Sequence, residues 1–306
     1  MKSPLTLAFG ILVTAILVAQ PALADLDVVT TTTDLADIVR AIGGDHVDVE
    51  SICQGSQDPH YVQARPSYMV TVSGADLLIA VGLELEVGWL PALIQGARNP
   101  DVNPGNLGYL EAASAIEPID VPTGSVDRSE GDLHPYGNPH FWLDPLNAQL
   151  AAAAIADRMG ELDPDNAATY DANLEIFNTQ IDEAMVRWSE AMAPYAGIQI
   201  TSYHRTFNYF FERFGLEPIG YIEERPGIPP APSHLARLIR LMQADDIPVI
   251  FHENYYDVSE SEMVAQRTDA SVIVLPVSVG GVEGTSSYEE LIDTIVNSFV
   301  ATMSER

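Results

Sequence analysis

The chain has 306 residues, 47% of them hydrophobic, and its 44 acidic residues against 14 basic ones give a formal net charge of −30. This length suits two lobes of ordinary domain size, and the apolar fraction is large enough for real cores. The negative charge excludes a nucleic-acid partner, because phosphate contacts need a basic footprint, and it opposes binding to anionic membranes.

The first 24 residues have the pattern of a cleavable secretory signal. Lys2 precedes a short apolar run at 5–19, and small residues end the segment. We therefore expect residues 1–24 to be removed and the mature protein to begin at Asp25 in the periplasm. Nothing later is long and apolar enough for membrane insertion. Cys53 is the single cysteine, so no intramolecular disulfide can form, and we expect it to be a core side chain.

Short apolar strand signals alternate with amphipathic helix signals along most of the chain. Apolar residues recur with helical spacing in 35–42, and Gly43 is placed to end that helix. Ser233, Ser259 and Ser287 are candidate helix N-caps. This alternation predicts parallel sheets flanked by helices. We expect strands at Leu26–Thr31, Val47–Ile52, Leu77–Val81, Ile198–Thr201, Val249–Phe251 and Val272–Leu275.

The middle of the chain has a different pattern. Apolar residues from Tyr170 to Met192 recur at steps of three and four, which predicts one long helix that begins near Pro164 and ends near Pro194. The predicted fold is therefore α/β, with two lobes, each a mainly parallel sheet flanked by helices, joined by one long rigid helix. The expected limits are residues 25–162 for the N-terminal lobe, 163–194 for the connecting helix and 195–306 for the C-terminal lobe.

Three histidines follow points where a strand-like segment breaks into a loop: His60, His140 and His204. On the two-lobe interpretation all three can point into the cleft between the lobes, where ligands usually bind. Three neutral imidazoles would form a site for a borderline-soft cation, zinc first and manganese or iron less so. Manganese sites are usually richer in carboxylate oxygens, whereas the ligand type leaves iron and copper open, so availability in the compartment must select among these metals. A histidine ligand is oriented by a hydrogen bond to its second nitrogen, and Asp58 and Asp144 are candidates for that supporting role.

The other histidines carry weaker predictions. We interpret His46 and His234 as surface residues. His134 lies in the loop before His140, and we expect it to be exposed to solvent, although it could pass metal inward. His252 is next to Glu253 after a buried strand, and it could support the metal ligands or simply line the cleft.

Five stretches of the chain resemble the zinc/manganese receptor family of ABC importers. They are Asp58–His60, Ala75–Glu86, Asn138–Pro145, His204 with the aromatic residues that follow it, and Pro230–Leu235. The resemblance covers nearly all of the mature chain in order. It implies a two-lobed receptor that binds a metal between its lobes and performs no chemistry, with His60, His140 and His204 at the family's first three ligand positions. It also implies a monomer that delivers zinc to an ABC permease and its ATPase in the inner membrane.

The sequence departs from this family at the fourth ligand. Family members usually supply an aspartate from a loop near the C-terminus, and Val277 occupies the matching position here. Valine has no atom that can coordinate a metal. Glu253, Asp257, Glu283 or a water molecule are the candidates for the missing ligand.

Two other functions are open at this point. A zinc-dependent hydrolase would use three histidines and an open coordination position, with Glu253 as the base. The sequence has no His-Glu-x-x-His helix and no Gly-x-Ser-x-Gly turn, which disfavours it. The second alternative is an adhesin that shares the receptor fold. No cysteine follows the apolar N-terminal run to carry a lipid anchor, which disfavours that function as well.

Overall fold

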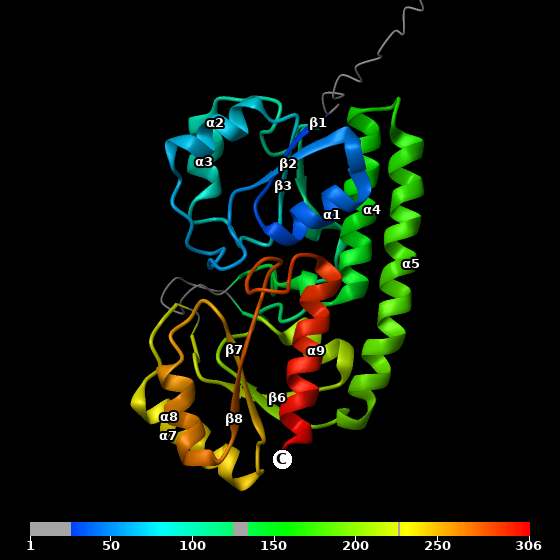
Figure 1. The fold of residues 1–306 in the computed structure, drawn as a ribbon. Helices are drawn as coiled ribbons and strands as arrows, with labels where there is room; N and C mark the ends of the chain where they lie inside the picture. Colours follow the sequence, from blue (N-terminus) through cyan, green and yellow to red (C-terminus); the bar gives the residue numbers. More distant parts are fainter. Residues whose placement is uncertain (1–25, 125–133, 226) are drawn as a thin grey trace, which may run out of the picture.

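A computed structural model describes residues 26–124, 134–225 and 227–306, so the predicted signal segment lies outside the described residues. The chain forms two lobes, and the long helix α5 (Ala167–Met192) runs beside both of them (Figure 1). Helix α4 (Pro145–Leu162) packs antiparallel against it. Each lobe contains a four-stranded parallel sheet, which confirms the predicted fold class. Among the described residues, no helix combines the length and apolarity needed to cross a membrane.

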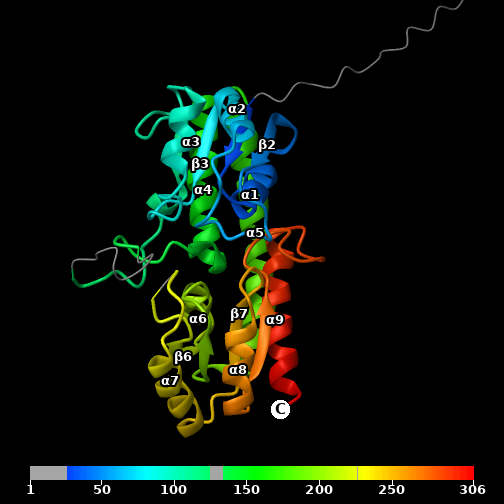
Figure 2. The ribbon, with the colours of Figure 1, turned by 90° about the vertical axis from the view of Figure 1, so that its left-hand side faces the viewer.

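The N-terminal lobe has the strand order β2-β1-β3-β4, with helices on both faces of the sheet (Figure 2). Val28 pairs with Val49 on one side and with Leu77 on the other. Alternate strand residues face opposite layers, because side chains along a strand point to the two faces in turn. One face packs on α1 and α4, and the other on α2 and α3. The remaining elements are β1 (Leu26–Thr30), α1 (Thr33–Gly43), η1 (Gly44–His46), β2 (Val47–Ser51), α2 (Pro66–Gly74), β3 (Leu77–Ala80), α3 (Leu90–Ala97), β4 (Tyr109–Glu111) and η2 (Ala112–Ala115).

The C-terminal lobe repeats this plan with the strand order β6-β5-β7-β8. Phe251 faces the layer of α6 and α9, whereas its neighbour Ile250 faces the layer of α7 and α8. The elements are η4 (Phe141–Leu143) before α4, then η5 (Ala193–Tyr195), β5 (Gln199–Ser202), α6 (Asn208–Phe214), β6 (Glu217–Tyr221), α7 (Pro232–Ala244), β7 (Val249–Glu253), α8 (Ser259–Thr268), β8 (Ser271–Leu275) and α9 (Tyr288–Ser304).

One apolar core continues from lobe to lobe. It contains buried residues of α1, α4 and α5 together with residues of β7, α6 and α9. Hydrogen bonds from the segment before α9 and from its first residue reach α1. The Val279 N–H donates to Asp34 Oδ1 at 2.9 Å, and the Tyr288 N–H donates to Asp37 Oδ2 at 2.7 Å. A wide swing of one lobe would have to break this core, so the structure favours small loop rearrangements over a hinge motion.

Some of the predicted helix ends agree with the structure and others differ from it. Helix α1 ends at Gly43 as predicted, and Gly44 follows it with a φ of 56°, which glycine adopts without a steric penalty. Ser287 caps α9 as predicted, since its side chain accepts a hydrogen bond from the backbone of the first turn. Ser233 and Ser259 lie inside the first turns of α7 and α8 and cap neither helix. In α7 a proline occupies the first position, where a missing N–H costs nothing.

Candidate metal centre

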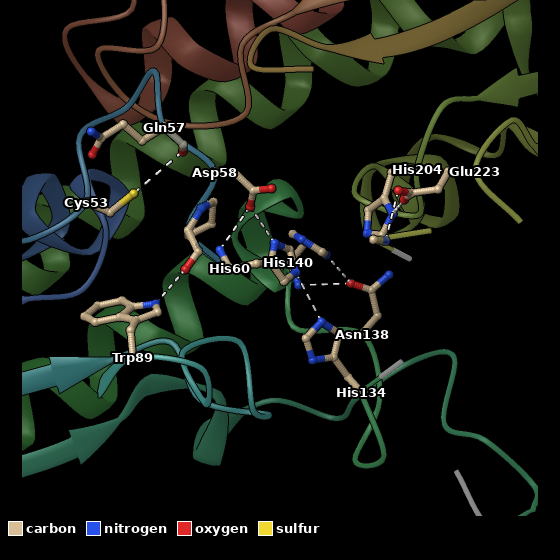
Figure 3. A network of polar contacts seen from close by, with 12 residues as sticks. Cys53, Gln57, Asp58, His60, Trp89, His134, Asn138, His140, His204 and Glu223 are labelled. Atoms are coloured by element: carbon tan, nitrogen blue, oxygen red, sulfur yellow. Dashed lines mark hydrogen bonds and ion pairs between the residues drawn. The ribbon is translucent and has the colours of Figure 1, made fainter. Parts of the chain in front are cut away.

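Three histidines from separate loops meet between the lobes. His60 lies in the loop after β2, His140 precedes η4, and His204 follows β5. Each is buried, and one ring nitrogen of each lies within 4.8 Å of the other two. Their ring centroids are 5.3 to 6.0 Å apart. The structure therefore brings together the three histidines that the sequence singled out, with His204 reaching the group from the opposite side to His60 and His140 (Figure 3).

A shared local motif orients two of these rings. Asp58 and Asn138 each lie two residues before one of the histidines, with a proline between them. Asp58 Oδ1 accepts hydrogen bonds from the His60 backbone N–H at 3.0 Å and from Nδ1 at 2.7 Å. Asn138 Oδ1 does the same for His140, at 3.0 and 2.8 Å. Each motif is an Asx turn in which the same oxygen also fixes the imidazole through Nδ1, so Nε2 is the nitrogen that points away from the turn.

The amide of Asn138 has a defined orientation. Its Nδ2 donates to Asp120 Oδ2 at 3.1 Å and to the Arg205 carbonyl at 2.8 Å, so Oδ1 must be the acceptor for His140 Nδ1. The Nε2 atom of His140 is buried and has no hydrogen-bond partner. Burial, followed by the charges of the neighbouring histidines, holds the pKa of His140 well below its ordinary value. The ring is therefore neutral at pH 7 and presents a lone pair, as a metal ligand must.

Glu223 orients the remaining ring, and with Asp58 it is one of two carboxylates beside the cluster. Glu223, which follows β6, accepts a hydrogen bond from His204 Nδ1 at 2.6 Å with Oε2 and one from the Gly227 N–H at 2.9 Å with Oε1. Burial alone would raise the pKa of Asp58, but the hydrogen bond and charge of His60 outweigh it and keep that pKa below its ordinary value. Asp58 therefore stays ionised at neutral pH beside the histidine cluster.

The structure corrects the role expected for Asp144. This residue caps α4 by accepting a hydrogen bond from the Leu146 N–H at 3.0 Å. It also forms a bidentate ion pair with Arg213, whose Nε and Nη2 donate to Asp144 Oδ1 and Oδ2 at 2.6 Å each. Asn138 takes the place that we expected Asp144 to fill. The repeated order of acid or amide, proline and histidine could have identified Asn138 from the sequence. Nothing in the sequence links Glu223 to His204 across 19 residues.

Two further expectations about histidines are wrong. His134 is half-buried, and its Nε2 lies 3.2 Å from Nε2 of His60. Burial, followed by the charges of His60 and His204, lowers the pKa of His134 to about 3. His234 is buried, and its Nε2 lies 2.8 Å from the carbonyl of Tyr221. His252 contacts Ser261 Oγ through Nδ1 at 2.8 Å, which ties β7 to α8.

The position of the expected fourth ligand offers no side-chain donor atom. Val277 is fully buried, and its carbonyl accepts a hydrogen bond from Trp142 Nε1 at 2.9 Å. Asp257 and Glu283 are exposed, and neither they nor Glu253 belong to the cluster found among the described residues. Glu253 is fully buried at the end of β7, where burial raises its pKa to about 8. The cluster therefore offers nitrogen ligands alone.

Comparison with known proteins identifies relatives over nearly the whole chain. Residues 28–302 match the family described as "ZnuA: Zinc-uptake complex component A periplasmic". The chain is 28% identical to the high-affinity zinc uptake system protein ZnuA of Yersinia pestis over 313 aligned positions, which cover 96% of each chain. It is 27% identical to the manganese ABC transporter substrate-binding lipoprotein PsaA of Streptococcus pneumoniae over 276 positions, which cover 86% of this chain and 84% of the relative.

Solved structures confirm the fold. A crystal structure of ZnuA has a TM-score of 0.76 and 23% identity, covering 90% of this chain and 98% of that one. A manganese-bound periplasmic metal-binding protein from Candidatus Liberibacter asiaticus has a TM-score of 0.74 and 23% identity, covering 91% and 99%. The matched family consists of solute-binding transport proteins, not enzymes. Both zinc and manganese occur in the names of the relatives.

Proposed function

The chain belongs to the ZnuA family of metal-binding receptors of ABC transporters, and we propose that its cargo is zinc, bound by His60, His140 and His204. One observation carries this proposal. Each of the three rings has its Nδ1 engaged by Asp58, Asn138 or Glu223, and a ring nitrogen of each lies within 4.8 Å of the others. Three imidazole nitrogens at such spacing suit zinc.

The same arrangement favours zinc over manganese. Manganese sites are usually richer in carboxylate oxygens, whereas imidazole suits zinc. The carboxylates nearest the cluster, Asp58 and Glu223, accept hydrogen bonds from the histidines themselves. They can balance the charge of a divalent cation and strengthen its ligands without occupying a coordination position.

The mechanism that we propose is capture and delivery. His60 and His140 come from the N-terminal half of the chain and His204 from the C-terminal half, so a bound ion would connect the two lobes. The core shared by both lobes limits the accompanying change to the loops that carry the ligands. In the periplasm the loaded protein would dock on an ABC permease, and displacement of a histidine during docking would release the ion for the ATPase-driven import step.

Calorimetry on the chelator-stripped protein tests the assignment. We expect one zinc ion per chain, weaker binding of manganese, and loss of zinc binding in His204→Ala. His46→Ala, which changes a histidine in η1 outside the cluster, is the matched control and should bind like the wild type. Absence of divalent-metal binding by the wild-type chain would overturn the proposal.

A further inference from the structure

We propose that His134 supplies the fourth ligand that Val277 cannot, so that four imidazoles bind the metal. This inference rests on the proposed function, because it assigns a further residue to the same site. It also makes the site more selective for zinc. Manganese prefers oxygen-rich sites, and a site of four nitrogens offers it no carboxylate oxygen.

The contact between His134 and His60 has the geometry of two ligands of one ion. Their Nε2 atoms are 3.2 Å apart. Two nitrogens bound to a tetrahedral zinc ion at 2.0–2.1 Å lie about 3.3–3.4 Å from each other. The centroids of these two rings are 5.3 Å apart, the same separation as between His60 and His140. Figure 3 shows His134 beside His60 and His140.

The hydrogen bonds around both rings turn their Nε2 atoms toward each other. The Nδ1 atom of His60 is hydrogen-bonded to Asp58 Oδ1, so Nε2 is the nitrogen that faces His134. His134 makes a hydrogen bond to the backbone of Leu83, and because its Nε2 faces His60, this bond falls to Nδ1. At 3.2 Å the two Nε2 atoms are close enough to bind one cation held between them.

The turn that holds His134 is strained. Leu83 and Glu84 follow β3 with φ values of 52° and 65°, a region that side chains other than glycine rarely adopt. The buried carboxylate of Glu86 holds this turn by accepting hydrogen bonds from the N–H groups of Val81 at 2.7 Å and Gly82 at 3.2 Å. Strain of this kind persists where the surrounding structure enforces it, and it clusters at ligand-binding sites.

His134 stands slightly apart from the other three rings. Its centroid is 6.4 Å from that of His140, and the group of atoms mutually within 4.8 Å contains His60, His140 and His204 alone. Metal binding would therefore draw His134 inward. The other three rings are buried, whereas His134 is only partly so, which places it on the solvent side of the site.

Nitrogen NMR of the full-length protein with ¹⁵N-labelled histidine tests this directly. Zinc is added to the chelator-stripped chain, and the ring nitrogens are followed, with each signal assigned by its loss in a single alanine variant. We expect four histidines, His134 among them, to acquire the shift of a metal-bound Nε2. If three shift and His134 stays unchanged, this inference is wrong while the zinc receptor assignment survives. If no histidine shifts, the proposed function fails.

Affinity provides a second readout. Loss of a residue that merely supports a ligand lowers metal affinity about 10- to 100-fold, so His134→Ala should cost at least about tenfold. The loss should be far smaller than that from His140→Ala, because His140 lies at the buried centre of the cluster. Tyr136→Ala changes an exposed side chain in the same loop and should bind zinc like the wild type. Wild-type affinity in His134→Ala would overturn the inference.

Discussion

Glu253 allows a sharp test of the assignment at the metal centre, because it is one of the carboxylate candidates for the fourth ligand. Its side chain is fully buried, and neither oxygen has a hydrogen-bond partner of good geometry. Burial raises its pKa to about 8, and the neighbouring Thr206 hydroxyl offsets this only in part. We predict that Glu253→Gln stabilises the metal-free protein in alkaline solution and leaves zinc affinity unchanged.

The magnitude follows from proton linkage. The carboxyl of Glu253 has a pKa near 4.5 in the unfolded chain and about 8 in the folded one. Between these values the folded state holds a proton that the unfolded state has lost, so the free energy of unfolding falls as pH rises. From pH 5 to pH 8 this amounts to about 3–4 kcal/mol, and glutamine, which does not titrate, removes it.

Urea unfolding in the presence of a chelator measures the effect at both pH values. The free energy of unfolding of Glu253→Gln minus that of the wild type should grow by about 3–4 kcal/mol from pH 5 to pH 8. The other titrating groups contribute equally to both proteins and cancel in this difference. Glu262→Gln makes the same chemical change at an exposed position and is the control. An identical pH dependence for variant and wild type would refute the reasoning. A large loss of zinc affinity would instead make Glu253 a ligand.

Two further predictions concern the surroundings of the site. Glu223→Ala should lower zinc affinity about 10- to 100-fold in a chelator competition assay, because it frees the His204 ring, whereas Glu224→Ala at the adjacent exposed position should have no effect. Equal affinities in the two variants would contradict the supporting role. Arg213→Ala should lower the free energy of unfolding by about 2–3 kcal/mol, because it leaves the buried Asp144 unpaired. Arg187→Ala removes an exposed ion pair and should cost less than about 1 kcal/mol in the same urea assay, so similar losses would count against this account.

Much of the fold could be predicted from the sequence because its buried strands are short runs of β-branched and aliphatic residues. Two strands gave no such signal. Strand β4 has three residues, and β6 contains Pro218 and Gly220. Both lie at sheet edges, where a missing hydrogen-bond donor or side chain is tolerated. Pairing with a neighbouring strand, and not local preference, makes these two segments extended.

The candidate site was predictable as far as its residues follow strands or carry a local motif. His60 and His140 share an Asx turn that is visible in the sequence, and His204 directly follows a buried strand. The positions of His134 and Glu223 depend on contacts with residues far along the chain, at Leu83 and His204. Such contacts exist only in the folded protein, so no spacing rule could have found them.

A crystal structure of the zinc-loaded protein, with anomalous diffraction at the zinc edge, would test the central claim most directly. The account predicts one anomalous peak between the lobes, about 2.0–2.1 Å from Nε2 of His60, His140 and His204. A zinc ion bound by other residues, or a zinc-loaded crystal in which these three rings do not bind the same ion, would contradict it.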